Sequence, residues 1–430
     1  MRFGGRLQAA IEVLADIEMR HRPVSEALKD WGVSHRFAGS GDRAVIGNIV
    51  YDALRWRASS AWAMGDDSPR SLVLGTVSRR WEVGAAALAE RTVGDDHAPE
   101  PLTPEEVTRL DSADLASAPD HIRADVPEWA AARLERVFGP DWVAEGEALA
   151  LRPPLDMRVN RLKSKREKVE AALAKFGATA TPYSPDGLRI APTSAEGRHP
   201  NVQVEPAFQK GWFEVQDEGS QIAALLVGTQ PGKQVLDLCA GAGGKTLALA
   251  AIMGGKGRVL ATDSDRGRLA PIFERVKRAA AHNVEVRGAG ESLKDATAKM
   301  DAVLVDAPCT GSGVWRRRPD AKWKLTERAL NNRLGEQAEL LRNAARYVKP
   351  GGRLVYATCS LLPEENEDQI AAFVADHPEF AVIAPAGLLA RGDVGDSLAS
   401  AALGVTYGVV LSPRRTATDG FFVAALERRA

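Results

Sequence analysis

Cysteine is scarce in this chain, which has only three such residues among 430. Cys239, Cys309 and Cys359 do not have the spacing of metal ligands or of a disulfide framework, which argues against a zinc site and a secreted disulfide scaffold. The seven histidines show no paired metal spacing either. We therefore expect no metal and a reducing, cytoplasmic environment.

Long apolar runs are also missing. No stretch approaches the roughly 20 apolar residues that a membrane-spanning helix needs. Residues 1–6 (MRFGGR) lack the apolar core of a signal peptide. A cytoplasmic monomer without a membrane partner is expected.

An excess of one charge is absent too, because the formal net charge is −1, so any nucleic-acid surface must be a local patch. Residues 158–168 (RVNRLKSKREK) form one basic segment, which is either a solvated face or an RNA contact. The run 316–318 (RRR), between Trp315 and Trp323, favours phosphate contacts, with the tryptophans either stacking on bases or packing in a core. The candidate RNA contacts are Arg158, Asn160, Arg316, Arg318 and Lys322.

The apolar pattern predicts three domains. Residues 1–127 have helical spacing and end in a linker rich in Pro, Asp, Ala and Glu, and residues 128–211 mix helices and short strands as a small α+β module. From residue 212 to 430 strands alternate with helices, which predicts a Rossmann-like, mostly parallel α/β sheet.

A glycine-rich loop follows the first predicted strand of that sheet. Glycines allow sharp turns and close backbone approach to a ligand, but Cys239 replaces the first glycine of a phosphate-binding P-loop. Asp263 ends the next strand, where a carboxylate can accept hydrogen bonds from ribose hydroxyls. The layout fits a dinucleotide or S-adenosylmethionine equally well. The candidate cofactor residues are Cys239, Ala240, Gly241, Ala242, Gly243, Gly244, Lys245 and Asp263.

Cys309 and Cys359 each follow a predicted strand, so parallel pairing would bring them to one edge of the sheet. Carbon 5 of a pyrimidine is a poor nucleophile until a thiolate adds at carbon 6, and a second thiol could assist release afterwards. Asp306, three residues before Cys309, could hydrogen-bond the polar edge of the base. The alternative is that both thiols are small buried hydrophobes.

These segments resemble the Sun-type, RsmB-like RNA (cytosine-5) methyltransferases. The resemblance is carried by residues 154–155 (PL), 158–160 (RVN), 215–218 (VQDE), 239–246 (CAGAGGKT), 306–313 (DAPCTGSG), 358–360 (TCS), 364–367 (EENE) and 419–422 (DGFF). The helical N-terminus, with residues 41–43 (GDR) and 51–55 (YDALR), is similar to the NusB-like RNA-binding domain of some members.

The resemblance implies a class I methyltransferase fold, S-adenosyl-L-methionine as the cofactor and methyl transfer to carbon 5 of a cytosine in 16S ribosomal RNA. It implies that Cys359 is the nucleophile, that Cys309 is needed for product release, and that the glycine loop, Asp263 and Asp306 contact the cofactor or the active site. The chain departs from the family pattern at Gly241-Ala242, where Ala-Pro is usual. It also departs at residues 288–291 (GAGE), where Glu291 would have to replace the usual acidic contact to the adenine.

Two other functions remain open at this point. Transfer RNA could be the substrate of the same site. Alternatively, the protein could be a non-catalytic RNA-binding factor for ribosome assembly that no longer transfers methyl groups. S-adenosylmethionine binding would favour the enzyme.

Overall fold

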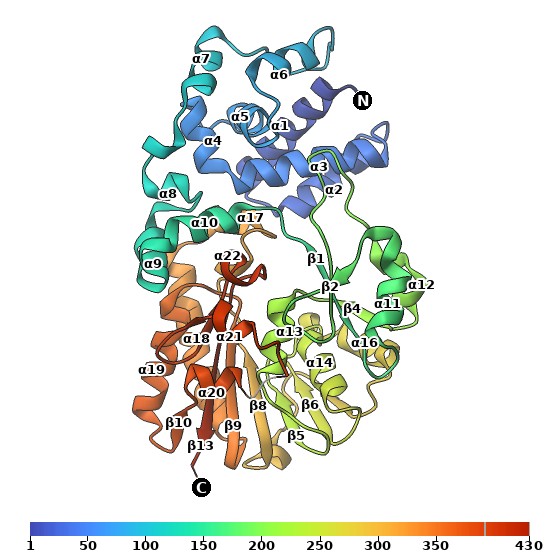
Figure 1. Cartoon of the computed structure of the whole chain (residues 1–430), viewed down its shortest axis with the longest axis vertical. Helices are drawn as coiled ribbons and strands as arrows, with labels where there is room; N and C mark the ends of the chain where they lie inside the picture. The colour runs from blue at the N-terminus through green and yellow to red at the C-terminus, as the bar shows by residue number, and fades with distance from the viewer. Residues whose placement is uncertain (391–392, 430) are drawn as a thin grey trace. The chain divides into compact units, whose positions relative to one another are not determined.

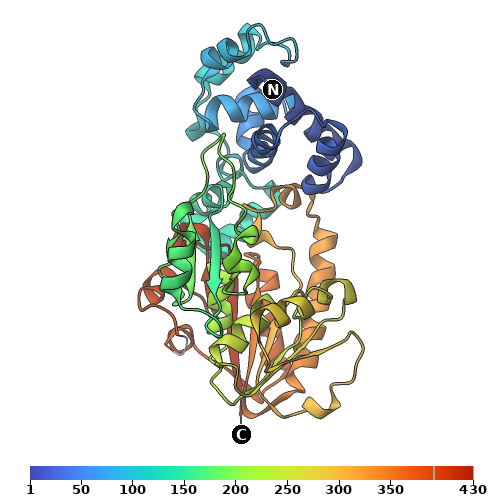
Figure 2. The same cartoon turned by 90° about the vertical axis from the view of Figure 1, so that its right-hand side faces the viewer.

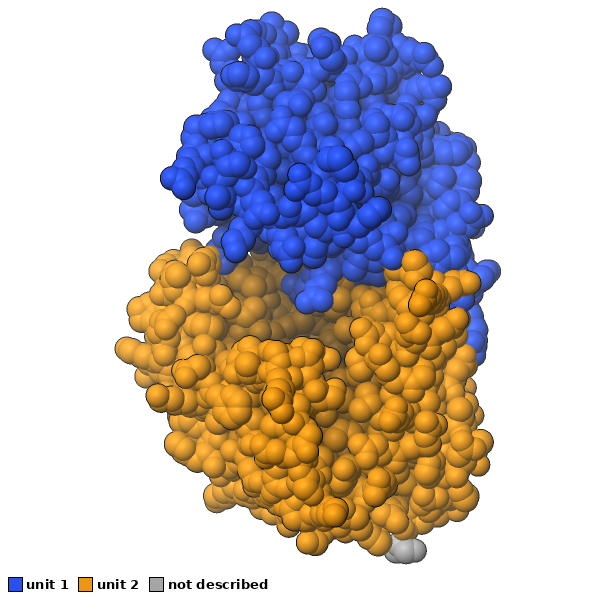
Figure 3. Space-filling view, turned by 180° about the vertical axis from the view of Figure 1, so that it is seen from behind, with its two compact units in different colours: residues 1–152, 192–200, 315–324 blue, residues 153–191, 201–314, 325–430 orange. Residues whose placement is uncertain are grey.

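The computed structural model describes residues 1–390 and 393–429, which divide into two compact units (Figure 3). We call residues 1–152, 192–200 and 315–324 the helical unit, and residues 153–191, 201–314 and 325–430 the α/β unit. The helical unit therefore extends beyond the predicted boundary at residue 127 and includes two short segments from later in the chain. None of the described helices is long and apolar enough to cross a membrane.

The helical unit forms around an apolar core, as its spacing predicted. Leu7, Leu14, Ile49 and Leu72 are fully buried there, from three different helices. Its helices are α1 (Phe3–Arg20), α2 (Val24–Ser34), α3 (Ser40–Arg55), α4 (Arg57–Met64), α5 (Pro69–Arg80), α6 (Ala85–Thr92), α7 (Pro104–Ser112), α8 (Asp120–Arg123), α9 (Glu128–Phe138), α10 (Trp142–Ala150) and α17 (Pro319–Lys324).

A small antiparallel sheet begins the α/β unit, with strand order β2-β3-β1-β4. Met157, Val159, Leu188 and Phe213 pack with Val169 in its own apolar core. Its elements are β1 (Leu155–Val159), α11 (Arg166–Leu173), β2 (Thr179–Ala180), β3 (Gly187–Ile190), α12 (Pro206–Gln209) and β4 (Phe213–Val215).

The larger sheet of this unit has nine strands in the order β11-β12-β13-β9-β8-β5-β6-β7, with β10 paired to β13. The strands from β9 to β7 are parallel and the C-terminal ones antiparallel, so the predicted mostly parallel sheet is confirmed. The strands are β5 (Gln234–Asp237), β6 (Arg258–Thr262), β7 (Val284–Arg287), β8 (Met300–Asp306), β9 (Val348–Thr358), β10 (Phe380–Val382), β11 (Leu403–Gly404), β12 (Val409–Leu411) and β13 (Phe421–Arg428).

Helices flank this sheet (Figures 1 and 2). Alternate strand residues such as Val235, Leu304 and Val355 pack with Leu247 of α14 in one apolar cluster, as the two-residue period of a strand requires. The helices are α13 (Glu218–Leu225), α14 (Gly244–Ile252), α15 (Arg266–Leu269), α16 (Ile272–Ala279), α18 (Glu327–Ala345), α19 (Glu367–Asp376), α20 (Pro385–Leu389), α21 (Leu398–Ala401) and α22 (Pro413–Thr416).

One predicted helix is interrupted. The pattern of residues 266–280 indicates a single helix, whereas the structure has α15 and α16 separated at Pro271. Proline has no backbone N–H to donate within a helix, and its ring clashes with the preceding turn. The second piece therefore begins afresh at Ile272, directly after the proline.

Candidate active site

The two cysteines that follow β8 and β9 lie together. These strands are parallel neighbours in which Asp306 pairs with Ala357, so their carboxyl ends share one edge of the sheet. The Sγ atoms of Cys309 and Cys359 are 3.4 Å apart and both residues are half-buried. The hydrogen bond to Cys359 and burial raise the pKa of the Cys309 thiol. The sequence prediction that both thiols reach one edge is confirmed.

Short hydrogen bonds tie the two cysteine loops to each other. The hydroxyls of Ser312 and Ser360 are 2.9 Å apart, and the Leu361 N–H donates to Ser312 Oγ at 2.7 Å. The Gly313 N–H donates to the Cys359 carbonyl at 2.9 Å. All three contacts cross from one loop to the other, so they fix the positions of the two thiols relative to each other.

The third cysteine, Cys239, has a different setting. It follows β5, the strand beside β8, but its side chain is buried. Burial raises the pKa of this thiol, and the nearby carboxylates of Asp237 and Asp306 raise it further. A buried thiol that stays protonated is a poor nucleophile, which separates Cys239 from the other two.

An ion pair links the glycine-rich loop to the loop of Cys309. Lys245 Nζ, at the start of α14, lies 2.8 Å from Asp306 Oδ2. The lysine side chain is buried, whereas 32% of the Asp306 side chain is exposed. A carboxylate that is held by an ion pair and is partly exposed can accept hydrogen bonds from a ligand.

The glycine-rich loop keeps a tight turn despite Gly241-Ala242. Gly241 and Gly243 have φ of 49° and 84°, a left-handed conformation that favours glycine. The Gly243 N–H donates to the Ala240 carbonyl at 2.8 Å, and a Cβ on Gly243 would lie 2.5 Å from Ile272 Cγ1. The departure from the family pattern therefore does not open the turn.

A buried carboxylate, Asp237, supports this loop from below. The Thr246 hydroxyl donates to Asp237 Oδ2 at 2.7 Å, while Oδ1 is buried without a hydrogen-bond partner. Burial raises the pKa of Asp237 to about 7.

Three of the candidate cofactor residues, Cys239, Asp263 and Glu291, line one cavity of about 270 Å³, whereas residues 240–245 of the glycine-rich loop and Asp306 are not in its lining. Asp263 lies at its wall, accepting hydrogen bonds from the N–H groups of Gly241 and Asp265, both at 2.9 Å. The exposed Glu291 also lines the cavity. The lining residues are Leu238, Cys239, Thr262, Asp263, Ser264, Arg268, Gly290, Glu291, Leu293, Pro308, Leu340, Asn343 and Tyr347.

Sequence reasoning missed the part of this wall that comes from α18 and its end. Leu340, Asn343 and Tyr347 carry no motif, and only their helical spacing after the Cys309 loop could have indicated them. Among residues 1–390 and 393–429, no group of three or more His, Cys, Asp and Glu side chains is placed to hold a metal ion.

Two of the predicted RNA contacts belong to the core of the small sheet. Arg158 is 4% exposed, and burial lowers its pKa to about 10. Asn160 is also buried and its side-chain amide donates to the carbonyls of Gly211 and Ala279, at 3.0 and 2.9 Å. The prediction that these two residues contact RNA is wrong, because neither side chain reaches the surface.

The second basic patch, which consists of residues 316–318 and Lys322, is also mostly buried and lies within the helical unit. Arg316 is 3% and Lys322 1% exposed, and Lys322 Nζ donates to the carbonyls of Arg55 and Asp125 at 2.9 and 2.5 Å. Burial lowers the pKa of Lys322 to about 8. Arg316 and Lys322 are therefore not phosphate contacts, and only Arg318 of this group is exposed. The packing alternative holds for Trp315, which is fully buried.

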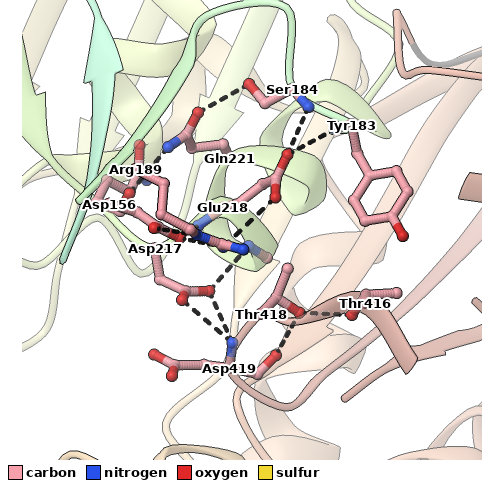
Figure 4. A network of polar contacts seen from close by, with 12 residues as sticks. Asp156, Tyr183, Ser184, Arg189, Asp217, Glu218, Gln221, Thr416, Thr418 and Asp419 are labelled. Atoms are coloured by element: carbon pink, nitrogen blue, oxygen red, sulfur yellow. Dashed lines mark hydrogen bonds and ion pairs between the residues drawn. The ribbon is translucent and has the colours of Figure 1, made fainter. Parts of the chain in front are cut away.

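A polar network joins the small sheet to the larger one (Figure 4). Arg189 donates two hydrogen bonds of 2.7 Å to Asp156, which also accepts from the Glu218 N–H at 3.0 Å. One residue before Glu218, Asp217 accepts from the Asp419 N–H at 3.1 Å. The VQDE and DGFF segments, 202 residues apart, therefore meet.

The DGFF segment continues this connection to the cysteine loops. The Gly420 N–H donates to the Gly313 carbonyl at 2.8 Å, and a Cβ on Gly313 would lie 2.1 Å from the Gly420 carbonyl oxygen. Only glycine at position 313 permits this approach. The small sheet is thereby connected, residue by residue, to the loop that carries Cys309.

The parallel sheet, the glycine-rich loop and the cavity with an acidic residue at its wall define a Rossmann-like, class I S-adenosylmethionine-dependent methyltransferase fold. The sequence model of the family described as 16S rRNA methyltransferase RsmB/F matches residues 224–427. The model of the RsmF/B-like ferredoxin-like domain matches residues 126–195. The chain belongs to the RsmB/F methyltransferase family.

Curated relatives and solved structures agree with this assignment. Ribosomal RNA small subunit methyltransferase B of Enterobacter sp. (strain 638) is 40% identical over 254 residues, covering 58% of this chain and 57% of the relative. The protein of that name from Pectobacterium atrosepticum is 35% identical over 305 residues, covering 70% and 66%. The matched part of the chain thus spans 57% and 66% of the length of these two relatives.

Two crystal structures share the fold over long stretches. The structure of PH0851 is 26% identical and covers 100% of this chain and 99% of that chain, with a TM-score of 0.71. A methyltransferase homolog protein from Pyrococcus horikoshii is 28% identical and covers 72% of this chain and 97% of that chain, with a TM-score of 0.57.

Proposed function

We propose that the protein transfers a methyl group from S-adenosylmethionine to carbon 5 of a cytosine in 16S ribosomal RNA. The observation that carries this proposal is the 3.4 Å separation of two half-buried thiols, Cys309 and Cys359, at the end of two parallel strands. Relatives named ribosomal RNA small subunit methyltransferase B support the choice of RNA. A cavity that suits a nucleoside-bearing cofactor lies at the same edge of the sheet.

In the proposed mechanism Cys359 is the nucleophile. Its thiolate adds to carbon 6 of the base, and the electron pair moved onto the ring makes carbon 5 able to attack a methyl group. After methylation, carbon 5 loses a proton to a base, the carbon 5–carbon 6 double bond re-forms, and the carbon 6–sulfur bond breaks to return the thiolate. Cys309, beside Cys359, is needed for this release.

The chain's own residues are suited to hold the cofactor. Asp263, at the wall of the cavity, keeps a lone pair on each oxygen for ribose hydroxyls after accepting its two backbone hydrogen bonds. Glu291 would contact the adenine, and the N–H groups at the start of α14 would face the amino-acid part. When bound, S-adenosylmethionine supplies an electrophilic methyl group.

Asp306 is proposed to hold the base. Its carboxylate can accept hydrogen bonds from the polar edge of cytosine, and the ion pair with the Lys245 ammonium orients it. The base must leave its stack to reach the thiols, because neither face of a stacked pyrimidine is open to a thiolate.

RNA affinity is proposed to come from exposed cations rather than from the buried ones. Lys163, Lys165 and Lys168 of the first basic segment are exposed, as is Arg318. Such side chains can neutralise RNA phosphates whatever the base sequence. The helical unit would add an RNA-binding surface of the NusB-like kind. The three free thiols support action in a reducing cytoplasm, where we propose that the protein works as a monomer.

Transfer of labelled methyl groups to 16S RNA transcripts tests the proposal. Wild type should label the RNA, Cys359→Ala should give neither product nor adduct, and Cys309→Ala should accumulate a denaturant-resistant protein–RNA adduct. An adduct with Cys359→Ala but not with Cys309→Ala would reverse the two roles. If wild type labels neither ribosomal nor transfer RNA, the proposed methyltransferase activity is excluded. If it labels transfer RNA alone, the substrate is transfer RNA and not 16S ribosomal RNA.

A further inference from the structure

Glu365 is a fully buried carboxylate next to the cysteine loops. It ends the short 3-10 helix Pro363–Glu365, which follows the Cys359 loop. One carboxylate oxygen accepts a 2.8 Å hydrogen bond from the N–H of Thr310, and the other accepts from the Thr310 hydroxyl. Thr310 directly follows Cys309, so Glu365 contacts the Cys309 loop through both the backbone N–H and the hydroxyl of Thr310.

A second buried side chain completes this contact. Gln337, from α18, donates through Nε2 to the Glu365 carboxylate at 3.0 Å and to the Pro308 carbonyl at 2.9 Å. Glu365 and Gln337 thus hold the residues on either side of Cys309. The Tyr356 hydroxyl fixes Glu365 in turn by donating to its carbonyl at 2.7 Å.

The loop of Cys359 has its own supports. Thr358 Oγ1 donates to Asn366 Oδ1 at 2.6 Å, and Asn366 Nδ2 donates to the Ser360 carbonyl at 2.9 Å. In the part of the chain that the structure describes, the carboxylate of Glu365 is hydrogen-bonded to Thr310 and Gln337 and not to residues 358–360, so the two thiols are held by different side chains. Loss of the Glu365 contacts should move one loop more than the other.

From this division we propose that Glu365 is a positioning residue for the release step, acting through Thr310 to keep Cys309 beside the bond that must break. The inference rests on the proposed function, because it assumes that Cys309 serves release. The buried Glu365 carboxylate accepts three hydrogen bonds, two of them from Thr310, and burying a carboxylate is unfavourable unless it is paired, so these contacts fix it against the Cys309 loop. Attack by Cys359 does not depend on Glu365, whereas turnover does.

Glu365→Gln is the first test, with Glu367→Gln as the matched control. Glu367 is in the same acidic segment, but its carboxylate accepts from the Tyr407 N–H at 3.3 Å and does not contact the Cys309 loop. In Glu365→Gln we expect methyl transfer in a single turnover to continue, release to slow by about a hundredfold, and a methylated adduct to accumulate as in Cys309→Ala. Glu367→Gln should behave as wild type.

Thr310→Val is the second variant, because it removes the hydroxyl contact to Glu365 and keeps the N–H. Thr310→Val should also raise the amount of adduct relative to released product, to a smaller extent than Glu365→Gln. This variant keeps the test available if Glu365→Gln does not fold. A merely structural role would lower adduct and product together. The inference is overturned if wild type methylates the RNA and neither variant accumulates more adduct than Glu367→Gln. If wild type itself transfers no methyl group, the proposed function fails instead.

Discussion

Lys245 Nζ lies 2.8 Å from Asp306 Oδ2 and so connects the glycine-rich loop to the loop of Cys309. The lysine side chain is almost completely buried, while the carboxylate is partly accessible. One ion pair therefore joins the start of α14 to the end of β8, the strand that leads to Cys309. Its loss should disturb the chemistry more than the fold.

Lys245→Met should lower kcat/KM for methyl transfer by about a hundredfold, because Asp306 would lose the cation that orients it. Asp306→Asn should cost at least as much. Binding of S-adenosylmethionine, measured by calorimetry, should weaken less than catalysis does. Equal losses in binding and turnover would contradict a role toward the base.

The buried and exposed members of the second basic patch should behave differently. Arg318→Gln should lower RNA affinity and reduce the slope of log affinity against log salt by about one, because it removes a single phosphate contact. Lys322→Gln should lower the melting temperature and leave that slope unchanged, since Lys322 Nζ is occupied by two carbonyls. Fluorescence anisotropy at several salt concentrations measures both slopes.

The α/β unit could be predicted because its information is local. Residues 284–287 and 258–262 have the strands that their apolar runs indicated, and the thiol pair followed from parallel strands ending at one edge. The break in residues 266–280 was missed, although Pro271 is a local signal for it.

The fate of the basic residues could not be predicted, because it depends on contacts between distant segments. Residues 315–324 pack within the helical unit, so Lys322 is buried against carbonyls of Arg55 and Asp125. Arg158 lies in a strand whose neighbours enclose it on both sides. A charge run in sequence resembles a solvated face until the segments that cover it are known.

Asp237 should make stability depend on pH in a direction opposite to most carboxylates. Burial raises its pKa from 3.8 to about 7, so the folded protein binds the proton more tightly than the unfolded chain between these values. Its contribution therefore favours folding below about pH 4 and is lost as pH rises toward 7, at about 1.4 kcal/mol per unit of pKa shift.

Asp237→Asn removes this titration while preserving the acceptor for Thr246. Urea unfolding of both proteins from pH 4 to 8 should show the variant gaining stability relative to wild type as pH increases. A constant difference across this range would mean that Asp237 is ionised throughout.

Cys239 should be chemically silent in the folded protein, although it ends a strand beside the reactive pair. Its buried thiol has a raised pKa, so little thiolate is available to react with iodoacetamide. Peptide mass spectrometry should find Cys239 unmodified until urea unfolds the chain, while Cys359 is modified first. Cys239→Ala should retain methyl transfer within a few-fold and lose about 1 kcal/mol of stability, as expected for a small buried side chain. Rapid alkylation of Cys239, or a loss of transfer comparable to that of Cys359→Ala, would give this third thiol a role in the chemistry.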